Sequence, residues 1–281
     1  MSRIALLANP DSGSGEAESV ERALSGHGAE VRRFAIDDAE QALEAGADRI
    51  VVAGGDGSIG CAADLASRSG VPLAVVAVGT ANDFARVHEL PDQLDDACEF
   101  AARGERTRSL ELGRIDGRAF VNVVSLGLSP AAARRASELK ARLGPLAYAV
   151  GAIRAGFSAQ PTWCRVVADD GEELFSGQAW QATVACSGAF GGGSQVEADP
   201  TDGMLDAVVV ESGSRLRLIA RAHGMRSGRL EQQSGVHKRR TRTVELELKP
   251  DTSLNVDGEL ITRSGIVRLT AEHDAVDLIV G

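Results

Sequence analysis

The clearest chemical signature lies in the segment 51–58. The apolar, β-branched stretch Val51–Ala53 runs into Gly-Gly-Asp-Gly at 54–57, and a helix-like pattern follows. Glycines allow close backbone approach, so successive N–H groups can turn onto an anion at the start of the next helix. Asp56 would repel a bare phosphate, which indicates a cation or a transferable proton beside the anion. Taken alone, the segment fits a tight strand-to-helix turn equally well.

A second loop of this kind follows one helix-like segment later. The apolar run Val71–Val78 ends in Gly-Thr-Ala-Asn-Asp-Phe-Ala-Arg at 79–86. A right-handed crossover places both strand ends at one edge of a parallel sheet, where ligands bind. We therefore expect Asp56 and Asp83 to be near neighbours. A helix cap at 82–83 is the alternative interpretation.

A third loop lies near the start of the chain. The strand-like segment Ile4–Ala8 runs into Asn-Pro-Asp-Ser-Gly-Ser-Gly at 9–15. Three such loops on one edge indicate a nucleotide pocket, although the glycines lack the Gly-Lys-Ser/Thr of a P-loop and only partly match a dinucleotide fingerprint. The residues expected to contact the nucleotide are Asn9, Ser12, Gly13, Gly54, Gly55, Gly57, Ser58, Gly79, Thr80 and Asn82.

The elements that carry these loops change character near residue 110. Strand and helix patterns alternate up to Arg103, whereas hairpins dominate from Arg108, with Asp-Gly turn signals at 116–117 and 170–171. A mostly helical stretch is expected over 131–156. The sequence therefore predicts a parallel α/β nucleotide-binding domain over 1–112, then a mainly antiparallel, β-sandwich-like domain over 113–281, with the active site in the cleft between them.

Size and composition favour a cytoplasmic enzyme. The chain has 281 residues, of which 43% are apolar, enough for a sizeable core. Its four cysteines lack C-x-x-C spacing and are interpreted as reduced thiols, and its five histidines lack the spacing of a zinc site. No basic-then-apolar leader and no apolar run near about 18 residues is present, so neither export nor a membrane span is expected.

Positive charge is concentrated in one segment. Arg215–Arg242 holds nine Lys or Arg residues and a single acid, although the chain has a net charge of −10. Nucleic acid is not an expected partner of so acidic a protein, but a basic face could meet anionic lipid headgroups at the inner face of the membrane. A solvated face or a salt-bridged surface between subunits is the alternative, and both a monomer and a homodimer are compatible with the sequence.

Together the motifs resemble those of the diacylglycerol kinase catalytic family, in particular its compact bacterial lipid kinases. The resemblance rests on Asn-Pro-x-Ser-Gly at 9–13, Gly-Gly-Asp-Gly-Ser at 54–58, the eight residues 79–86, Gly-Gly-Gly at 191–193, Asp-Pro-Thr-Asp-Gly at 199–203 and Asp-Gly-Glu at 257–259. It thus covers nearly the whole chain. Gly-Gly-Asp-Gly also occurs in NAD kinases and phosphofructokinases, so the match at 79–86 is the specific one.

The resemblance implies ATP as phosphoryl donor and Mg²⁺ as cofactor. It places a structural Mg²⁺ at the carboxylate of Asp202 and the carbonyls of Asp199 and Met204, tied through water towards Asp83 and Asp56. Carboxylate and carbonyl oxygens suit Mg²⁺. By its residues alone, the segment is a turn before a strand.

The segment 255–259 has the pattern of a hairpin turn. The resemblance implies that Asp257 is the general base for the acceptor hydroxyl and that Glu259 is a ligand of the catalytic Mg²⁺, with Asp56 in the same catalytic group. Phosphoryl transfer uses such an arrangement, because a carboxylate takes the hydroxyl proton while Mg²⁺ offsets charge on the phosphate oxygens.

Several residues depart from the family pattern. Ser58 replaces the usual Thr but keeps the hydroxyl, and Ser14 and Glu16 stand where the family often has basic residues. Ser129 stands where these lipid kinases usually have an acid near the acceptor. The departures leave the acceptor less defined than the ATP site.

The preferred hypothesis is an ATP- and Mg²⁺-dependent lipid kinase that acts on the hydroxyl of diacylglycerol or a related lipid alcohol. One alternative is a kinase of the same fold with a soluble acceptor, either NAD or a small natural-product alcohol; the sequence at 82–86 argues against NAD. The other alternative is a weakly active nucleotide-binding protein.

Overall fold

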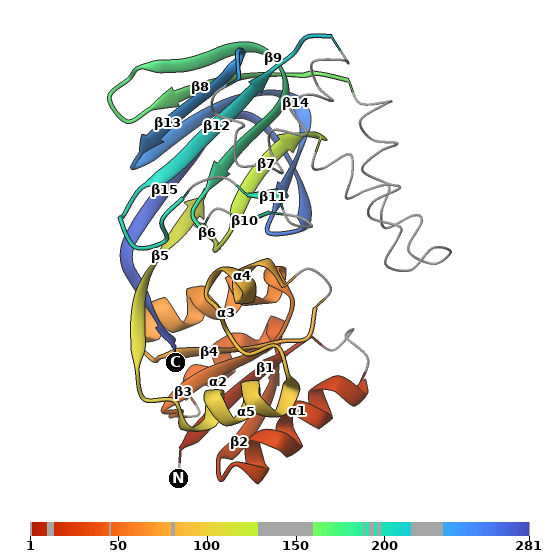
Figure 1. Cartoon of the computed structure of the whole chain (residues 1–281), viewed down its shortest axis with the longest axis vertical. Coiled ribbons are helices and arrows are strands. Elements are labelled where there is room, and N and C mark those ends of the chain that lie inside the picture. The colour runs from red at the N-terminus through yellow and green to blue at the C-terminus, as the bar shows by residue number, and fades with distance from the viewer. Residues whose placement is uncertain are drawn as a thin grey trace.

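The computed structural model has an α/β region and a β-rich region, which lie at the bottom and top of Figure 1. It describes residues 2–9, 14–44, 46–79, 82–128, 160–187, 189–190, 194–195, 198–214 and 233–280. The predicted fold class and two-domain organisation are confirmed. Outside the described residues lie Ser12, Gly13, Thr80, Ser129, the glycines 191–193 and the stretch 131–156 predicted as helical.

The N-terminal region is a parallel sheet with the strand order β4-β3-β1-β2. The predicted alternation of strands and helices is confirmed, and a short additional helix, α4, follows β4. The elements are β1 (Arg3–Ala8), α1 (Ser14–Gly26), β2 (Glu30–Ala35), the 3-10 helix η1 (Ile36–Asp38), α2 (Ala39–Glu44), β3 (Arg49–Gly54), α3 (Asp56–Ser69), β4 (Leu73–Ala77), α4 (Asp83–Val87) and α5 (Leu94–Arg103).

Both faces of this sheet are covered at β1, β3 and β4, which explains the apolar runs of these three strands. Ile4 and Leu6 of β1 pack in a cluster with residues of α1 and α5. Ala5 and Leu7, which point the other way, pack in a cluster with residues of α2 and α3. A shift by one residue would exchange the two apolar sets, so the register of β1 depends on side-chain packing rather than on polarity.

The three loops predicted to bind the nucleotide begin at one edge of the sheet. The parallel register aligns Ala8 with Ala53, and Gly54 with Ala77. The carboxyl ends of β1, β3 and β4 therefore lie side by side, and Asn9 and the two glycine loops start from this common edge, as predicted.

The second region is mainly antiparallel, with a core between β8, β9, β12, β14 and β15. Residues alternate between buried and less buried along the first part of β14, so one face of this strand faces the core. The elements are β5 (Thr107–Ile115), β6 (Arg118–Phe120), β7 (Val123–Gly127), β8 (Thr162–Ala168), β9 (Glu173–Ala185), β10 (Ala189–Phe190), β11 (Ser194–Gln195), β12 (Leu205–Glu211), β13 (Val236–Thr241), β14 (Thr243–Val256) and β15 (Glu259–Ile279).

Two hairpins have two-residue Asp-Gly turns. The φ angles are 48° and 86° at Asp116 and Gly117, and 47° and 94° at Asp257 and Gly258. Positive φ at both central residues is the geometry that matches the twist of antiparallel strands. The hairpins predicted at these two positions are confirmed.

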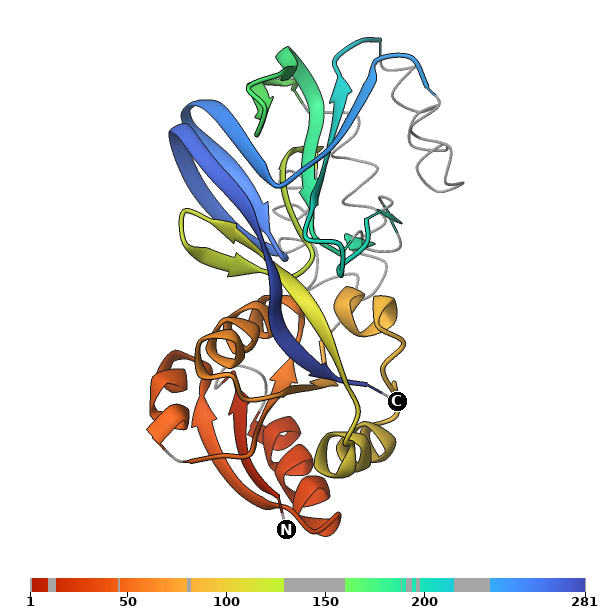
Figure 2. The same cartoon turned by 90° about the vertical axis from the view of Figure 1, so that its left-hand side faces the viewer.

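Two long strands connect the regions. β5 and β15 pair antiparallel from Ile115 and Leu269 down to Thr107 and Ile279, and both run between the two regions in Figure 2. Leu278, near the end of β15, also pairs with β4 of the first region. The C-terminal strand thus completes the N-terminal sheet, while the proposed boundary at residue 112 stays a prediction.

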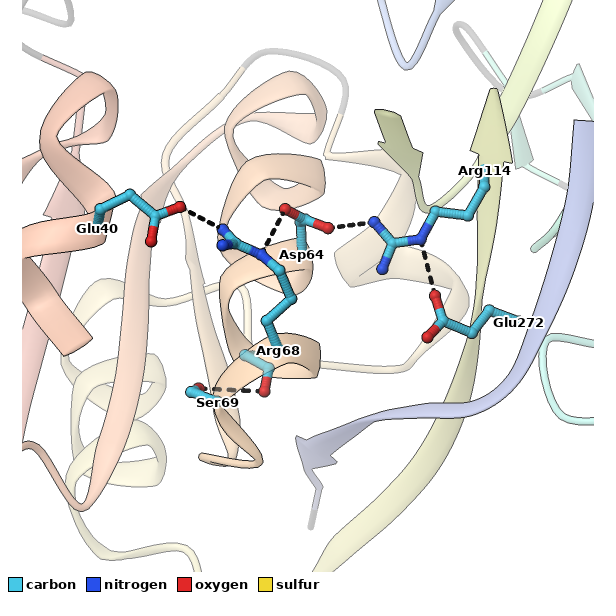
Figure 3. Close-up of polar contacts among 7 residues, drawn as sticks. Glu40, Asp64, Arg68, Ser69, Arg114 and Glu272 are labelled. Carbon is cyan, nitrogen blue, oxygen red and sulfur yellow. Dashed lines mark hydrogen bonds and ion pairs between the residues drawn. The ribbon is translucent and has the colours of Figure 1, made fainter. Parts of the chain in front are cut away.

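A chain of ion pairs fixes α3 to these connecting strands (Figure 3). Arg68 bonds Glu40 of α2 at 2.6 Å and Asp64 at 3.1 Å. Asp64 also pairs with Arg114 of β5, whose Nε lies 2.7 Å from Glu272 of β15. Arg114 is only 18% exposed, so solvent screens its two ion pairs less than it screens surface pairs.

We predict that Arg114→Met lowers the free energy of unfolding by about 1–2 kcal/mol, because Asp64 and Glu272 both lose their guanidinium partner. Urea denaturation measures this change. Arg33→Met is the matched control, since Arg33 forms an exposed ion pair with Glu21 at 3.4 Å, and it should change stability by less than about 0.5 kcal/mol. Equal effects of the two substitutions would contradict the role given to the ion-pair chain.

Candidate active site

The glycines of the two central loops allow close packing. A Cβ on Gly79 would lie 2.6 Å from the Cα of Gly55, and one on Gly57 would lie 2.9 Å from Oε1 of Glu259. Real Cβ atoms do not approach other atoms so closely. Glycine is therefore required at Gly79, where one loop backbone packs on the other, whereas at Gly57 the Glu259 side chain of the β14–β15 hairpin lies close against the first region.

Asp56 begins α3 but binds the start of α4. Its Oδ1 accepts the N–H of Phe84 at 2.9 Å, and its Oδ2 accepts the N–H of Asp83 at 3.3 Å. The residue that precedes α4, Asn82, makes no capping bond of its own. Asp56 thus caps α4 from the neighbouring loop. The predicted proximity of Asp56 and Asp83 is confirmed, and the buried Asp83 also pairs with Arg86 at 2.8 Å.

Asn122 connects Asp56 to the second region. Its Nδ2 donates to Oδ1 of Asp56 at 3.1 Å, and its Oδ1 accepts the hydroxyl of Ser187 at 2.7 Å. No sequence motif singles out this residue. The available signal was a polar side chain directly before the buried strand β7, and that pattern alone does not name a partner.

Backbone N–H groups surround the carboxylate of Asp257. Val121 donates to Oδ2 at 2.7 Å, while Asn122 and Val123 donate to Oδ1, each at 2.9 Å. Burial raises the pKa of Asp257 to about 7, against the opposing effect of these bonds and with a further rise from the charge of Asp56. The carboxylate is thus bound through both oxygens to the loop between β6 and β7.

Glu259 follows the same turn in a more open position. Its side chain is 52% exposed, pairs with Arg118 of β6 and lies against Gly57. A cavity of about 100 Å³ lies between α3 and the two Asp-Gly hairpins, and Asp257 is among its lining residues. This volume holds roughly three waters and is too small for a nucleotide.

The segment expected to bind a structural magnesium ion forms local turns. Oδ1 of Asp199 accepts the N–H of Thr201, and Oδ1 of Asp202 accepts the N–H of Met204, each at 3.0 Å. Oδ2 of Asp202 lies 3.0 Å from Arg240. Each oxygen of Asp202 thus has one protein partner and keeps a second acceptor position. Among the described residues, no three His, Cys, Asp or Glu side chains are arranged to hold a metal ion, and the ligand set stays a prediction.

Glu111 of β5, which the sequence analysis missed, anchors this segment. Its Oε2 accepts the N–H of Gly203 at 2.5 Å, and its own N–H donates to the carbonyl of Pro200 at 2.9 Å. Burial raises the pKa of Glu111 to about 7. No short-range sequence pattern marks this contact, because its partner is about ninety residues away in the chain.

Three basic side chains of β13 pair with acids. Lys238 and Arg240 lie 3.6 and 3.5 Å from the buried Asp206, and Arg239 pairs with two acids of the β8–β9 turn. These ion pairs lie within one chain at β13, whereas residues 215–232 lie outside the described part. The described helices include none long and apolar enough to cross a membrane.

Each of the two regions matches the model of a known domain family. Residues 3–115 match the model of the diacylglycerol kinase catalytic domain, and residues 122–280 match that of the YegS C-terminal NAD kinase beta sandwich-like domain. A diacylglycerol kinase of Bacillus subtilis is 30% identical over 75% of this chain and 71% of its own length. One of Mycobacterium tuberculosis is 27% identical over 92% of this chain and 88% of its own length.

A solved structure of a putative diacylglycerol kinase from Bacillus anthracis has the same fold, with a TM-score of 0.78 and 20% identity over 100% of this chain and 97% of that chain. The two domain models together span both regions of the structure, and the Bacillus subtilis relative is matched over most of its length. The chain therefore belongs to the diacylglycerol kinase family and is a kinase, a phosphotransferase with an alcohol acceptor.

Proposed function

We propose that this kinase transfers the γ-phosphoryl group of ATP, bound with Mg²⁺, to the hydroxyl of diacylglycerol or a related lipid alcohol. The observation that carries the proposal is the position of Glu259 against Gly57. A carboxylate of the second region thereby meets the loop expected to hold the triphosphate, as phosphoryl transfer requires. The relatives named diacylglycerol kinase support a lipid alcohol as the acceptor.

The donor side uses the common edge of β1, β3 and β4. α3 starts here, and its N-cap residue, Gly55, provides no side-chain cap. The N-terminus of a helix carries partial positive charge and N–H groups that bind phosphate oxygens. Mg²⁺ bound with ATP would offset charge on the phosphate oxygens during transfer.

The two hairpin acids have different surroundings, which supports different roles. Both oxygens of Asp257 accept backbone N–H bonds, so we assign it the task of holding the loop 121–123 in place. Glu259 is half exposed beside the glycine loop, so we assign it the role of general base, which takes the proton of the acceptor hydroxyl. This division differs from the one that the family resemblance implies, in which Asp257 is the general base and Glu259 a ligand of Mg²⁺.

The acceptor assignment predicts that labelled ATP with Mg²⁺ yields a labelled lipid when the enzyme is given diacylglycerol in mixed micelles. Parallel reactions contain phosphatidylglycerol, other lipid alcohols, NAD or small alcohols. We expect EDTA to abolish transfer, because the triphosphate charge is then uncompensated. Label found solely in a water-soluble product would refute the lipid acceptor and favour the soluble one.

The assignment of Glu259 predicts that Glu259→Gln lowers kcat by about 10²–10⁴-fold, the usual value of a positioned base. ATP binding, measured by calorimetry, and the melting temperature should stay close to wild type, since the side chain is half exposed. Arg118→Gln is the control, because it removes the ion-pair partner but leaves the carboxylate. If Glu259→Gln retains more than about a tenth of wild-type turnover, Asp257 becomes the candidate base instead.

Stability should depend on pH through Asp257. Its pKa is raised in the folded protein from 3.8 to about 7, so the folded state binds more protons than the unfolded state between these values. The contribution of Asp257 to the free energy of unfolding therefore falls as the pH rises from about 4 to about 7. Urea denaturation across this range should show a smaller decrease for Asp257→Asn than for wild type, and identical slopes would contradict the buried position.

A further inference from the structure

Asn122 is a buried polar residue that has no assigned role in the proposed phosphoryl transfer. It is 3% exposed and lies between β6 and β7. Its side chain bonds Asp56 and Ser187. Its backbone N–H donates to Asp257 at 2.9 Å, and its carbonyl accepts the N–H of Cys186 at 2.8 Å. Backbone and side chain are both held, so the residue has little freedom to move.

The side-chain bonds have a fixed direction. Asp56 accepts hydrogen bonds, so the amide must present its NH₂ group to that carboxylate. The hydroxyl of Ser187 can donate to the amide oxygen at the opposite end, 2.7 Å away. A flipped amide would place oxygen against carboxylate, so Ser187 favours the orientation that serves Asp56.

The bonds also join the two regions at one atom. Oδ1 of Asp56 receives the N–H of Phe84 from the first region and the NH₂ of Asn122 from the second. α4, which Asp56 caps, contacts β10 just after Ser187 in the chain. The direction of the Asp56 carboxylate therefore depends on how the second region is docked.

We propose that Asn122 is a positioning residue, which orients Asp56 through the hydrogen-bonded series Ser187–Asn122–Asp56 so that the glycine loop and α4 are placed for phosphoryl transfer. The proposal rests on the kinase function proposed above. Its distinguishing consequence is a loss in kcat with little change in nucleotide affinity, since the loop backbone that binds the phosphates remains.

Asn122→Asp tests the donor, because it keeps the side-chain shape and the acceptor for Ser187 but removes the NH₂ group. We expect kcat to fall by about 10–100-fold, the cost of a small misplacement, while KM for ATP changes by less than about threefold. Ser187→Ala should lower kcat in the same way by a smaller factor.

Thr183→Val is the matched control. Thr183 is a buried polar residue of β9 that accepts a hydrogen bond from Gln181 within the second region. The kcat of this variant should therefore stay within about twofold of wild type. An unchanged kcat in both Asn122→Asp and Ser187→Ala, or a rise in KM with kcat preserved, would overturn the proposal.

A double-mutant cycle tests the bond without any substrate. Asn122→Asp places two carboxylates against each other. In Asp56→Asn the amide oxygen can still accept from Asn122, and in the double variant the repulsion is absent because residue 56 is neutral. We expect the double variant to unfold at a higher urea concentration than Asn122→Asp alone, with effects that are not additive. Additive effects would refute the bridge. Absence of phosphoryl transfer by the wild-type enzyme would refute the proposed function instead, and the cycle would still decide the role of Asn122.

Discussion

The carboxylate of Asp56 has to satisfy hydrogen-bond donors from two regions of the chain at once. Two N–H groups at the start of α4 and the amide of Asn122 converge on its oxygens. Charge-assisted bonds of this kind are about twice as strong as neutral ones, and an unmet partly buried donor is costly. The glycine loop, α4 and the loop after β6 are therefore held in one arrangement.

The connecting strands bring these groups together. β15 begins at Glu259, directly after the turn that holds Asp257, and pairs with β4 of the first region at its end. β5 runs beside it and is bonded to α3 through Arg114 and Asp64. Because β15 both begins at the acid-bearing hairpin and joins the N-terminal sheet, a shift between the regions would separate Glu259 from the glycine loop.

Local patterns predicted most of the fold, since they depend on neighbouring residues. Apolar runs gave the strands of the parallel sheet, and Asp-Gly pairs gave the turns at 116–117 and 257–258. Contacts between distant residues were not predictable in this way. Asn122 bonds Asp56, which is sixty-six positions away in the chain, and Arg240 pairs with the carboxylate of Asp202, which was expected to bind a metal. Sequence periodicity does not show which way a hydrogen bond runs, nor whether a carboxylate such as Asp202 pairs with a metal ion or with an arginine.

Hydrogen–deuterium exchange in wild type and Asp56→Ala tests most directly whether Asp56 holds both regions. The amides of Asp83 and Phe84 lose their acceptor in the variant, and Asn122 loses the partner of its side chain. We expect faster exchange at residues 83–84 together with residues 121–123, which bond Asp257. Faster exchange at 83–84 with wild-type protection at 121–123 would contradict the account, because the two regions would then be held independently of Asp56.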